Sequence, residues 1–117
     1  EKSTSDESKS SFQLYEQELY NEAIPLLAQD STNIDKNWYL SQAYLADNQL
    51  EKAESMLLAI ITADGKYALD AKWYFALIQI RNNNYTSALE LLKDLSTSTN
   101  SFYRTKSTQL IKKLDSK

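Results

Sequence analysis

Apolar side chains recur at the spacing of an amphipathic helix along most of the chain, and short polar segments separate these stretches. Between residues 12 and 27 the apolar positions fall three or four residues apart, and the same spacing returns at 34–46, 50–62, 66–81, 85–95 and 102–114. Ala53, Leu57 and Ile60, for example, form the i, i+4, i+7 stripe of a half-buried helix. The pattern predicts a series of amphipathic helices joined by short polar turns.

Part of this pattern occurs twice, and equivalent residues of the two copies are separated by a constant interval. Trp73 follows Trp38 by 35 residues, and Ala88 follows Ala53 by the same interval. A helical repeat of this length is typical of helical hairpins stacked in an array. We therefore expect the second half of the chain to repeat the architecture of the first.

The expected helix ends carry their own signals. Asn48 and Asn83 hold matching places just after the first helix of each copy, where a residue with positive φ is usually needed. Gly65, the only glycine, follows the stretch at 50–62, where a residue at the C′ position is expected. Thr32 or Asn33 can cap the helix at 34–46. These signals support the repeat independently of the aromatic residues.

The N-terminal part of the chain allows more than one interpretation. Residues 1–11 are polar and Ser-rich, which is typical of a flexible leader, although a helix start capped by Ser or Thr fits them equally well. Residues 12–29 could form one long helix with Pro25 in its middle, at a cost of about 3 kcal/mol. A second helix that starts near Asn21 would place Pro25 in its first turn and avoid that cost. We expect two helices, with a turn near Glu18 that has neither Gly nor Asn.

Composition agrees with an all-α fold. The 117 residues include one Gly and one Pro, which is far too few for a turn-rich β architecture. The length is typical of one domain. We predict a single domain over residues 12–117, with hairpins at about 12–29, 34–62 and 67–95 and a capping helix at about 101–114.

Charge and hydropathy restrict the partners. The net charge is −3 and no dense Lys/Arg cluster is present, so we expect no nucleic-acid partner. The apolar stretches of the chain, such as 57–61 and 73–78, are much shorter than the roughly 18 residues that span a bilayer, so we expect no membrane insertion by this segment.

The repeat resembles the tetratricopeptide repeat family, in which hairpins of about 34 residues stack on one another. The match rests on a small residue where the two helices of a hairpin touch, an aromatic residue three positions later, an Ala in the second helix and a large apolar residue four positions after it. The small residues are Ser41 and Ala76, and the aromatic residue is Tyr44, whose place in the second copy is taken by Gln79. The Ala residues of the second helices are Ala23, Ala53 and Ala88, and the large apolar residues are Leu27, Leu57 and Leu92. The copies lack the closing Pro of the family, and their spacing is 35 residues. The resemblance implies a right-handed superhelical stack of about three antiparallel hairpins with a C-terminal capping helix.

A second resemblance concerns location. The chain is similar to the C-terminal repeat segments of bacterial membrane-anchored proteins, which implies the bacterial periplasm rather than the cytoplasm. The sequence begins at Glu1 rather than at Met, so we expect any signal peptide or membrane anchor to precede it.

The residues needed for most catalytic chemistry are missing. The chain has no His and no Cys, which removes the commonest general base, the imidazole and thiolate metal sites and the usual nucleophile arrangements. A single Gly cannot build a phosphate-binding loop, so we expect no nucleotide cofactor. Asp35 and Asp70 occupy equivalent positions of the repeat and could form a glycosidase-like pair. The simpler interpretation is that each carboxylate stabilises the N-terminus of its helix. We therefore expect a non-enzymatic protein without cofactor or metal.

Aromatic residues are the candidates for a binding surface. The chain has eight Tyr, three Phe and two Trp, and aromatics and Arg dominate binding hot spots. In the family, the first helices of successive hairpins line a concave groove. Carrying the positions over implies a groove formed by Tyr15, Trp38, Tyr39, Gln42, Trp73, Tyr74, Leu77 and Arg81. The alternative is that Trp38 and Trp73 pack between adjacent hairpins and belong to the core.

The resemblance and the aromatic content together predict a protein-protein interaction module, a scaffold or adaptor that binds a peptide or helix in this groove. Two alternatives remain open. Tyr and Trp faces could bind a glycan, or the aromatic face could mediate self-association as a homodimer. Fold alone does not choose among these functions.

Overall fold

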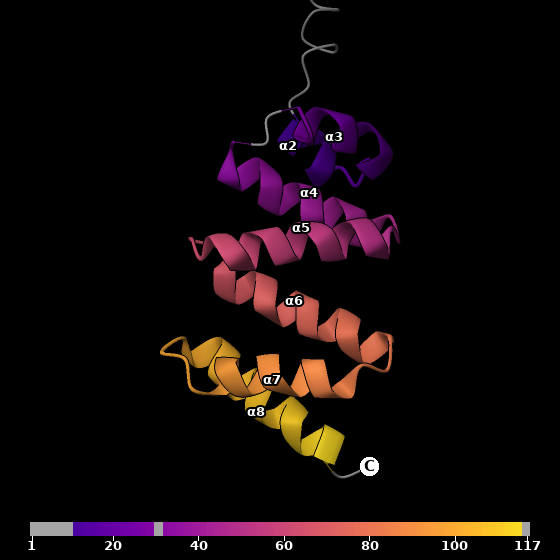
Figure 1. Ribbon diagram of the computed structural model, residues 1–117. Helices are drawn as coiled ribbons and strands as arrows, with labels where there is room; N and C mark the ends of the chain where they lie inside the picture. The colour runs from indigo at the N-terminus through magenta and orange to yellow at the C-terminus, as the bar shows by residue number, and fades with distance from the viewer. Residues whose placement is uncertain (1–10, 30–31, 116–117) are drawn as a thin grey trace, which may run out of the picture. The chain divides into compact units, whose positions relative to one another are not determined.

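The computed structural model describes residues 11–29 and 32–115, and within them the chain is all-α, as predicted, with helices and no strand (Figure 1). The helices are α2 (Ser11–Glu16), α3 (Tyr20–Leu27), α4 (Ile34–Ala46), α5 (Leu50–Ala63), α6 (Ala68–Arg81), α7 (Tyr85–Ser96) and α8 (Ser101–Asp115). The leader expected at residues 1–11 lies outside the described residues except for Ser11, which opens α2.

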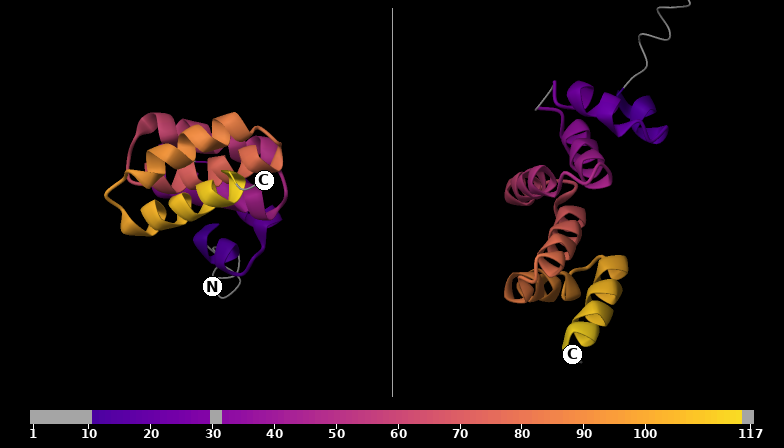
Figure 2. Two further views of the ribbon diagram at one scale, coloured as in Figure 1. Left: turned by 90° about the horizontal axis from the view of Figure 1, so that it is seen from below. Right: turned by 90° about the vertical axis from the view of Figure 1, so that its right-hand side faces the viewer.

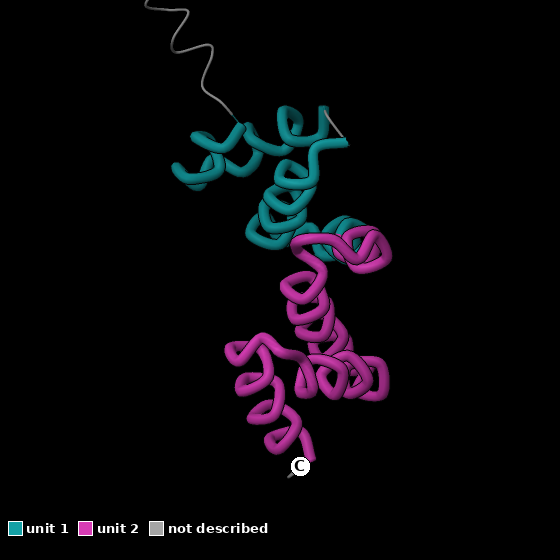
Figure 3. Tube along the Cα trace, turned by 90° about the vertical axis from the view of Figure 1, so that its left-hand side faces the viewer, with its two compact units in different colours: residues 1–56 teal, residues 57–117 magenta. Residues whose placement is uncertain are grey.

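The chain divides into two compact units, residues 1–56 and residues 57–117 (Figure 3). The boundary falls within α5, so the first turns of this helix belong to unit 1 and the remainder to unit 2. The expectation of a single domain stays a prediction.

Three hairpin turns have the same backbone conformation. Glu18, Asn48 and Asn83 have φ of 62°, 60° and 64°. At each turn this residue donates its N–H to the carbonyl three residues earlier, and the next residue donates to the carbonyl five residues earlier. This pair of bonds is the Schellman motif, which satisfies carbonyls at the end of a helix. The predictions for Asn48 and Asn83 are confirmed, and so is the division of residues 12–29 into two helices.

Two details of the sequence interpretation are wrong. Pro25 lies inside α3, five residues after its first residue Tyr20, rather than in the first turn. It has no N–H to donate to the carbonyl of Asn21, and α3 ends two residues after it. At the end of α5, Asp64 has φ of 51° whereas Gly65 does not have positive φ. The turn therefore uses a residue with a short polar side chain, which tolerates the left-handed region, one position earlier than expected.

Asn side chains cap the starts of α4 and α8, whereas Asn84 at the start of α7 makes no side-chain cap bond. The Asn33 side chain accepts a hydrogen bond of 3.0 Å from the backbone N–H of Lys36, which confirms the expected cap of α4. Asn100 accepts from the N–H of Tyr103 at 3.2 Å and opens α8 in the same way.

The buried positions repeat in all three hairpins. Ala23, Ala53 and Ala88 are fully buried, and the Leu four residues after each of them is also fully buried. A small buried residue precedes each Ala by 12 residues, namely Ser11, Ser41 and Ala76. Small side chains on both helices let the helix axes approach closely. The predicted register is confirmed, and it extends to a first hairpin whose small residue, Ser11, the sequence had assigned to the leader.

Unit 1 is organised around one apolar cluster. Leu14 of α2, Ala23 and Leu27 of α3, and Leu40 and Ala43 of α4 form its buried part. Partly buried aromatic and aliphatic side chains surround it, including Tyr15, Tyr39 and Met56. Each of α2 and α3 therefore contacts α4 within this unit.

Unit 2 packs α6, α7 and α8 in succession, and α8 also contacts α6 (Figure 2). Leu92 and Leu95 of α7 are fully buried, as is Ser107 of α8. An ion pair of 2.7 Å between Lys72 and Asp94 links α6 to α7 at the surface. The contact between α6 and α8 brings together side chains that are about 30 residues apart in the sequence.

Candidate functional site

In unit 1 the structure brings two predicted groove residues, Tyr15 and Tyr39, into contact. Their ring centroids are 5.0 Å apart in an edge-to-face arrangement. Phe12 meets Tyr39 in the same way at 5.0 Å, and Tyr20 meets Tyr15 at 5.5 Å. We call Phe12, Tyr15, Tyr20 and Tyr39 the α2–α4 aromatic cluster.

The α2–α4 aromatic cluster packs against the core of unit 1 on one side and is partly exposed to solvent. All four side chains are partly buried, and all pack on the core formed by Leu14 and its neighbours. Edge-to-face pairs of this kind are each worth about 0.5–1.5 kcal/mol beyond the area that they bury. These contacts therefore restrict the four rings, which stay partly exposed and can contact a ligand.

The other predicted groove residues of unit 1 are placed differently. Trp38 lies on α4 and is half-buried. Gln42 is also half-buried, and its Nε2 atom is enclosed and has no hydrogen-bond partner among the described residues. Gln42 therefore does not present its amide donor to solvent.

In unit 2 the predicted residues lie along α6. Trp73 and Tyr74 are half-buried, Leu77 is 36% exposed and Arg81 is exposed. Tyr74, Leu77 and Arg81 recur every three or four residues and so share one side of α6. Neither Trp38 nor Trp73 is wholly buried, so the choice between core and groove stays open for both.

The contact between α6 and α8 contains residues that the sequence did not indicate. Trp73 lies 6.1 Å from the ring of Tyr103, and Phe102 makes an edge-to-face contact with Tyr103 at 5.1 Å. The ammonium group of Lys106 lies 5.8 Å from the centre of the Trp73 ring and 5.1 Å from that of Phe102. We call Trp73, Phe102 and Lys106 the α6–α8 edge.

Tyr103 anchors α8 through a hydrogen bond in which its hydroxyl donates to the carboxylate of Asp70 on α6. Burial and the neighbouring Asp70 carboxylate raise the pKa of the Tyr103 phenol. Asp70 therefore has a structural partner, and both Asp35 and Asp70 lie in the first turn of their helices, where a carboxylate suits the helix dipole. Because these two residues belong to different units, the structure gives no geometry for a catalytic pair.

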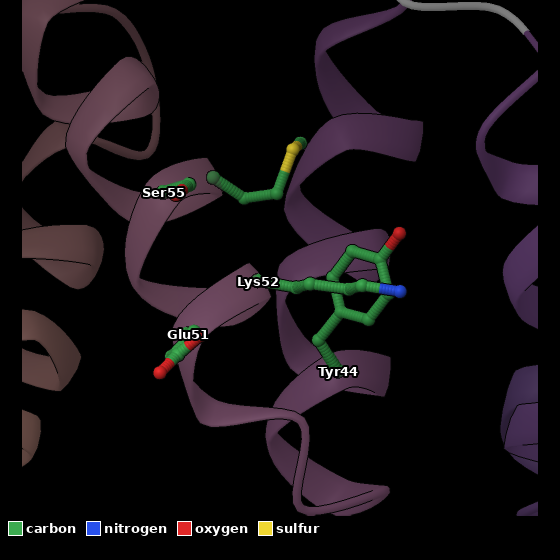
Figure 4. Close-up of a pocket in the computed structure, with 5 residues that line it drawn as sticks. Tyr44, Glu51, Lys52 and Ser55 are labelled. Atoms are coloured by element: carbon green, nitrogen blue, oxygen red, sulfur yellow. The ribbon is translucent and has the colours of Figure 1, made fainter.

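Three of the surface hollows formed by the described residues lie at helix ends or between helices. One of ≈ 390 Å³ is bordered by Tyr44 on α4 and by the start of α5, where Lys52 points its ammonium group toward the Tyr44 ring at 5.8 Å (Figure 4). A second, of ≈ 450 Å³, surrounds the turn between α6 and α7 and is lined by amide and hydroxyl side chains together with Glu90. The third, of ≈ 200 Å³, lies beside the turn between α2 and α3. None of these three is lined by the eight predicted groove residues.

The described residues also lack two other kinds of site. No group of three or more acidic side chains within them is placed to hold a metal ion. No helix in the same residues has the length and apolarity needed to cross a bilayer.

Comparison of the chain with protein-family models, with curated proteins and with solved structures finds no significant match.

Proposed function

We propose that this chain is a non-catalytic, tetratricopeptide-like interaction module that binds a peptide or a helix along the first helices of its hairpins. The observation that carries the proposal is the α2–α4 aromatic cluster, in which Tyr15 and Tyr39 are fixed edge to face on the surface of the core. Tyr side chains offer a large contact area with few rotatable bonds. Contacts with neighbouring rings already restrict these side chains in the free protein. Binding of a ligand therefore costs the protein little further conformational entropy.

The side of α6 formed by Tyr74, Leu77 and Arg81 supports the same proposal in unit 2. It combines an aromatic ring, an exposed aliphatic side chain and an exposed guanidinium group on one helix. This composition is enriched at binding hot spots. The resemblance of the repeat to segments of bacterial membrane-anchored proteins supports a periplasmic partner.

The test is capture of a partner by the purified protein and by a variant with the substitutions Tyr39→Ala, Tyr74→Ala and Arg81→Ala. Membrane and soluble fractions of the source cell supply the candidate partners. We expect the wild type to retain a protein that the triple variant loses. A peptide made from that protein should then bind the wild type in a fluorescence titration and bind the triple variant at least about tenfold more weakly.

Tyr85→Ala is the matched control, because Tyr85 is 44% exposed on α7 and lies outside the predicted groove. Circular dichroism should show that all variants keep the wild-type helix content. Capture that survives the triple substitution, or that Tyr85→Ala abolishes equally, would refute the proposed groove. Soluble oligosaccharides that raise the melting temperature of the wild type but not of the triple variant would instead identify a glycan-binding module.

A further inference from the structure

The two units carry opposite net charge. Residues 1–56 contain 11 acidic and four basic side chains, whereas residues 57–117 contain five acidic and nine basic ones. The formal charges are therefore −7 and +4, although the whole chain carries only −3. Charges separated in this way steer unlike surfaces of two molecules together and keep like surfaces apart.

Unit 2 presents an exposed aromatic ring with a lysine ammonium group beside it. The side chain of Phe102 is 59% exposed, the largest exposure among the large hydrophobic residues described. Lys106 is one helical turn further along α8 and lies over the rings of Phe102 and Trp73. No carboxylate of the described residues lies within ion-pair distance of Lys106. The α6–α8 edge thus offers a ring and an ammonium group that a second molecule can reach.

Unit 1 presents the complementary combination. Glu18, Glu22 and Asp47 surround the ≈ 200 Å³ hollow beside the turn between α2 and α3. Leu19, which is 38% exposed, and Tyr20 supply apolar parts of its lining. A cavity of about 150 Å³ accommodates a benzene ring, so this hollow has room for one aromatic side chain. We call these five residues the α2–α3 acidic surface.

We propose that the chain associates with itself head to tail, with the α6–α8 edge of one copy docked on the α2–α3 acidic surface of the next. Phe102 of one copy enters the hollow beside Leu19 of the other, and Lys106 approaches the carboxylates of Glu18 and Glu22. The two contacting surfaces are different, so the interface is heterologous, and repetition of the contact adds further copies. A two-fold dimer through the α6–α8 edge would instead place the Lys106 ammonium groups of the two copies near each other.

The test is sedimentation velocity on the purified protein from micromolar to millimolar concentration. We expect the average mass to rise with concentration beyond that of a dimer, either continuously or up to the mass of a closed ring, because a heterologous contact joins each copy to a next one. Raising the salt from about 0.1 M to about 1 M shortens the Debye length from about 10 Å to about 3 Å, and it should weaken the association. A wild-type protein that stays monomeric throughout, even if its α6–α8 edge binds an acidic peptide, would overturn the proposal.

Single charge reversals locate the contact. Lys106→Glu should weaken self-association about tenfold or more, because it places a carboxylate against Glu18 and Glu22. Lys112→Glu makes the same change in net charge at an exposed position on another side of α8 and should leave the association nearly unchanged. Equal effects of the two substitutions would show that only the overall charge of α8 matters and would overturn the proposed contact.

Mixing two variants tests the pairing itself. One variant carries Phe102→Ala and Lys106→Glu and keeps the α2–α3 acidic surface; the other carries Glu18→Lys and Glu22→Lys and keeps the α6–α8 edge. Each alone should be monomeric, and their mixture should form a one-to-one complex that grows no further. A mixture that stays monomeric would overturn the proposal. The proposed peptide groove is tested separately, because none of these substitutions touches Tyr39, Tyr74 or Arg81.

Discussion

At the scale of the residue, the small buried side chains at the hairpin contacts control whether the helices can pack. Ala53 of α5 is fully buried. An Asp at this position would place a carboxylate where a buried methyl group now fits, and burial of an unpaired charge costs several kcal/mol. We expect Ala53→Asp to abolish the cooperative thermal transition measured by circular dichroism, or to lower its midpoint strongly.

The control for this substitution lies on the same helix. Ala59 of α5 is exposed, so Ala59→Asp introduces the same side chain into water and should lower the free energy of unfolding only by its helix-propensity cost, about 0.7 kcal/mol. An unchanged midpoint in Ala53→Asp would show that the register of the hairpins is wrong.

At the scale of the element, the turn between α2 and α3 is the least favourable of the three hairpin turns. Glu18 has φ of 62°, where a side chain without a short polar group is disfavoured by about 1–2 kcal/mol. Glycine adopts this conformation without that cost, although it loses more backbone entropy on folding. We therefore expect Glu18→Gly to raise the free energy of unfolding by about 1 kcal/mol, measured by urea denaturation.

The matched control is Glu16→Gly at the end of α2. This residue is also an exposed Glu, but it has helical backbone geometry, so Gly there should lower stability by up to about 1 kcal/mol. Effects of the same sign in the two variants would contradict the assignment of the left-handed conformation to Glu18.

The sequence predicted best those features that depend on residues close together in the chain. Helix extents and the turns at Asn48 and Asn83 follow from periodicity and residue type within a few neighbouring positions. Glu18 adopts positive φ although its residue type does not favour this conformation, and Asp64 adopts it although the next residue, Gly65, is the more permissive one. The contact of Tyr103 with Asp70 joins residues 33 positions apart, and nothing in the periodicity of α8 indicates which side chain of α6 it meets.

The candidate surfaces were predicted less completely than the helices. The sequence pointed to aromatic residues of α2, α4 and α6 as a binding surface, and whether they bind a partner stays a prediction. It omitted Phe102 and Lys106, although their spacing of four residues places them on one side of a helix. The net charge of the whole chain did not reveal the opposite charges of the two units. Their charges can be counted only once the boundary between the units is known, and that boundary follows from packing.

At the scale of the whole molecule, the pH dependence of stability should report the attachment of α8 to α6. Burial and the Asp70 carboxylate raise the pKa of Tyr103 above its ordinary value of 10.0. The folded state therefore retains a proton that the unfolded state loses, and this contribution to stability is present below pH 10 and decreases as the pH rises above it. We expect the urea midpoint to fall between pH 9 and pH 11 by more in the wild type than in Tyr103→Phe, which has no phenol to titrate at this position.

Tyr103→Phe should also be less stable than the wild type at pH 7, by about 1–3 kcal/mol, because it removes a hydrogen bond to a carboxylate. Tyr85→Phe controls for the loss of a hydroxyl group, since its hydrogen bond to Asn83 lies on the surface and does not involve Asp70. The two measurements separate two roles of Tyr103. An unchanged stability at pH 7 together with an unchanged alkaline slope would mean that the ring, which Phe keeps, rather than the hydroxyl attaches α8. A steeper alkaline slope in Tyr103→Phe would contradict the raised pKa, because removing the phenol can only remove its contribution to the slope.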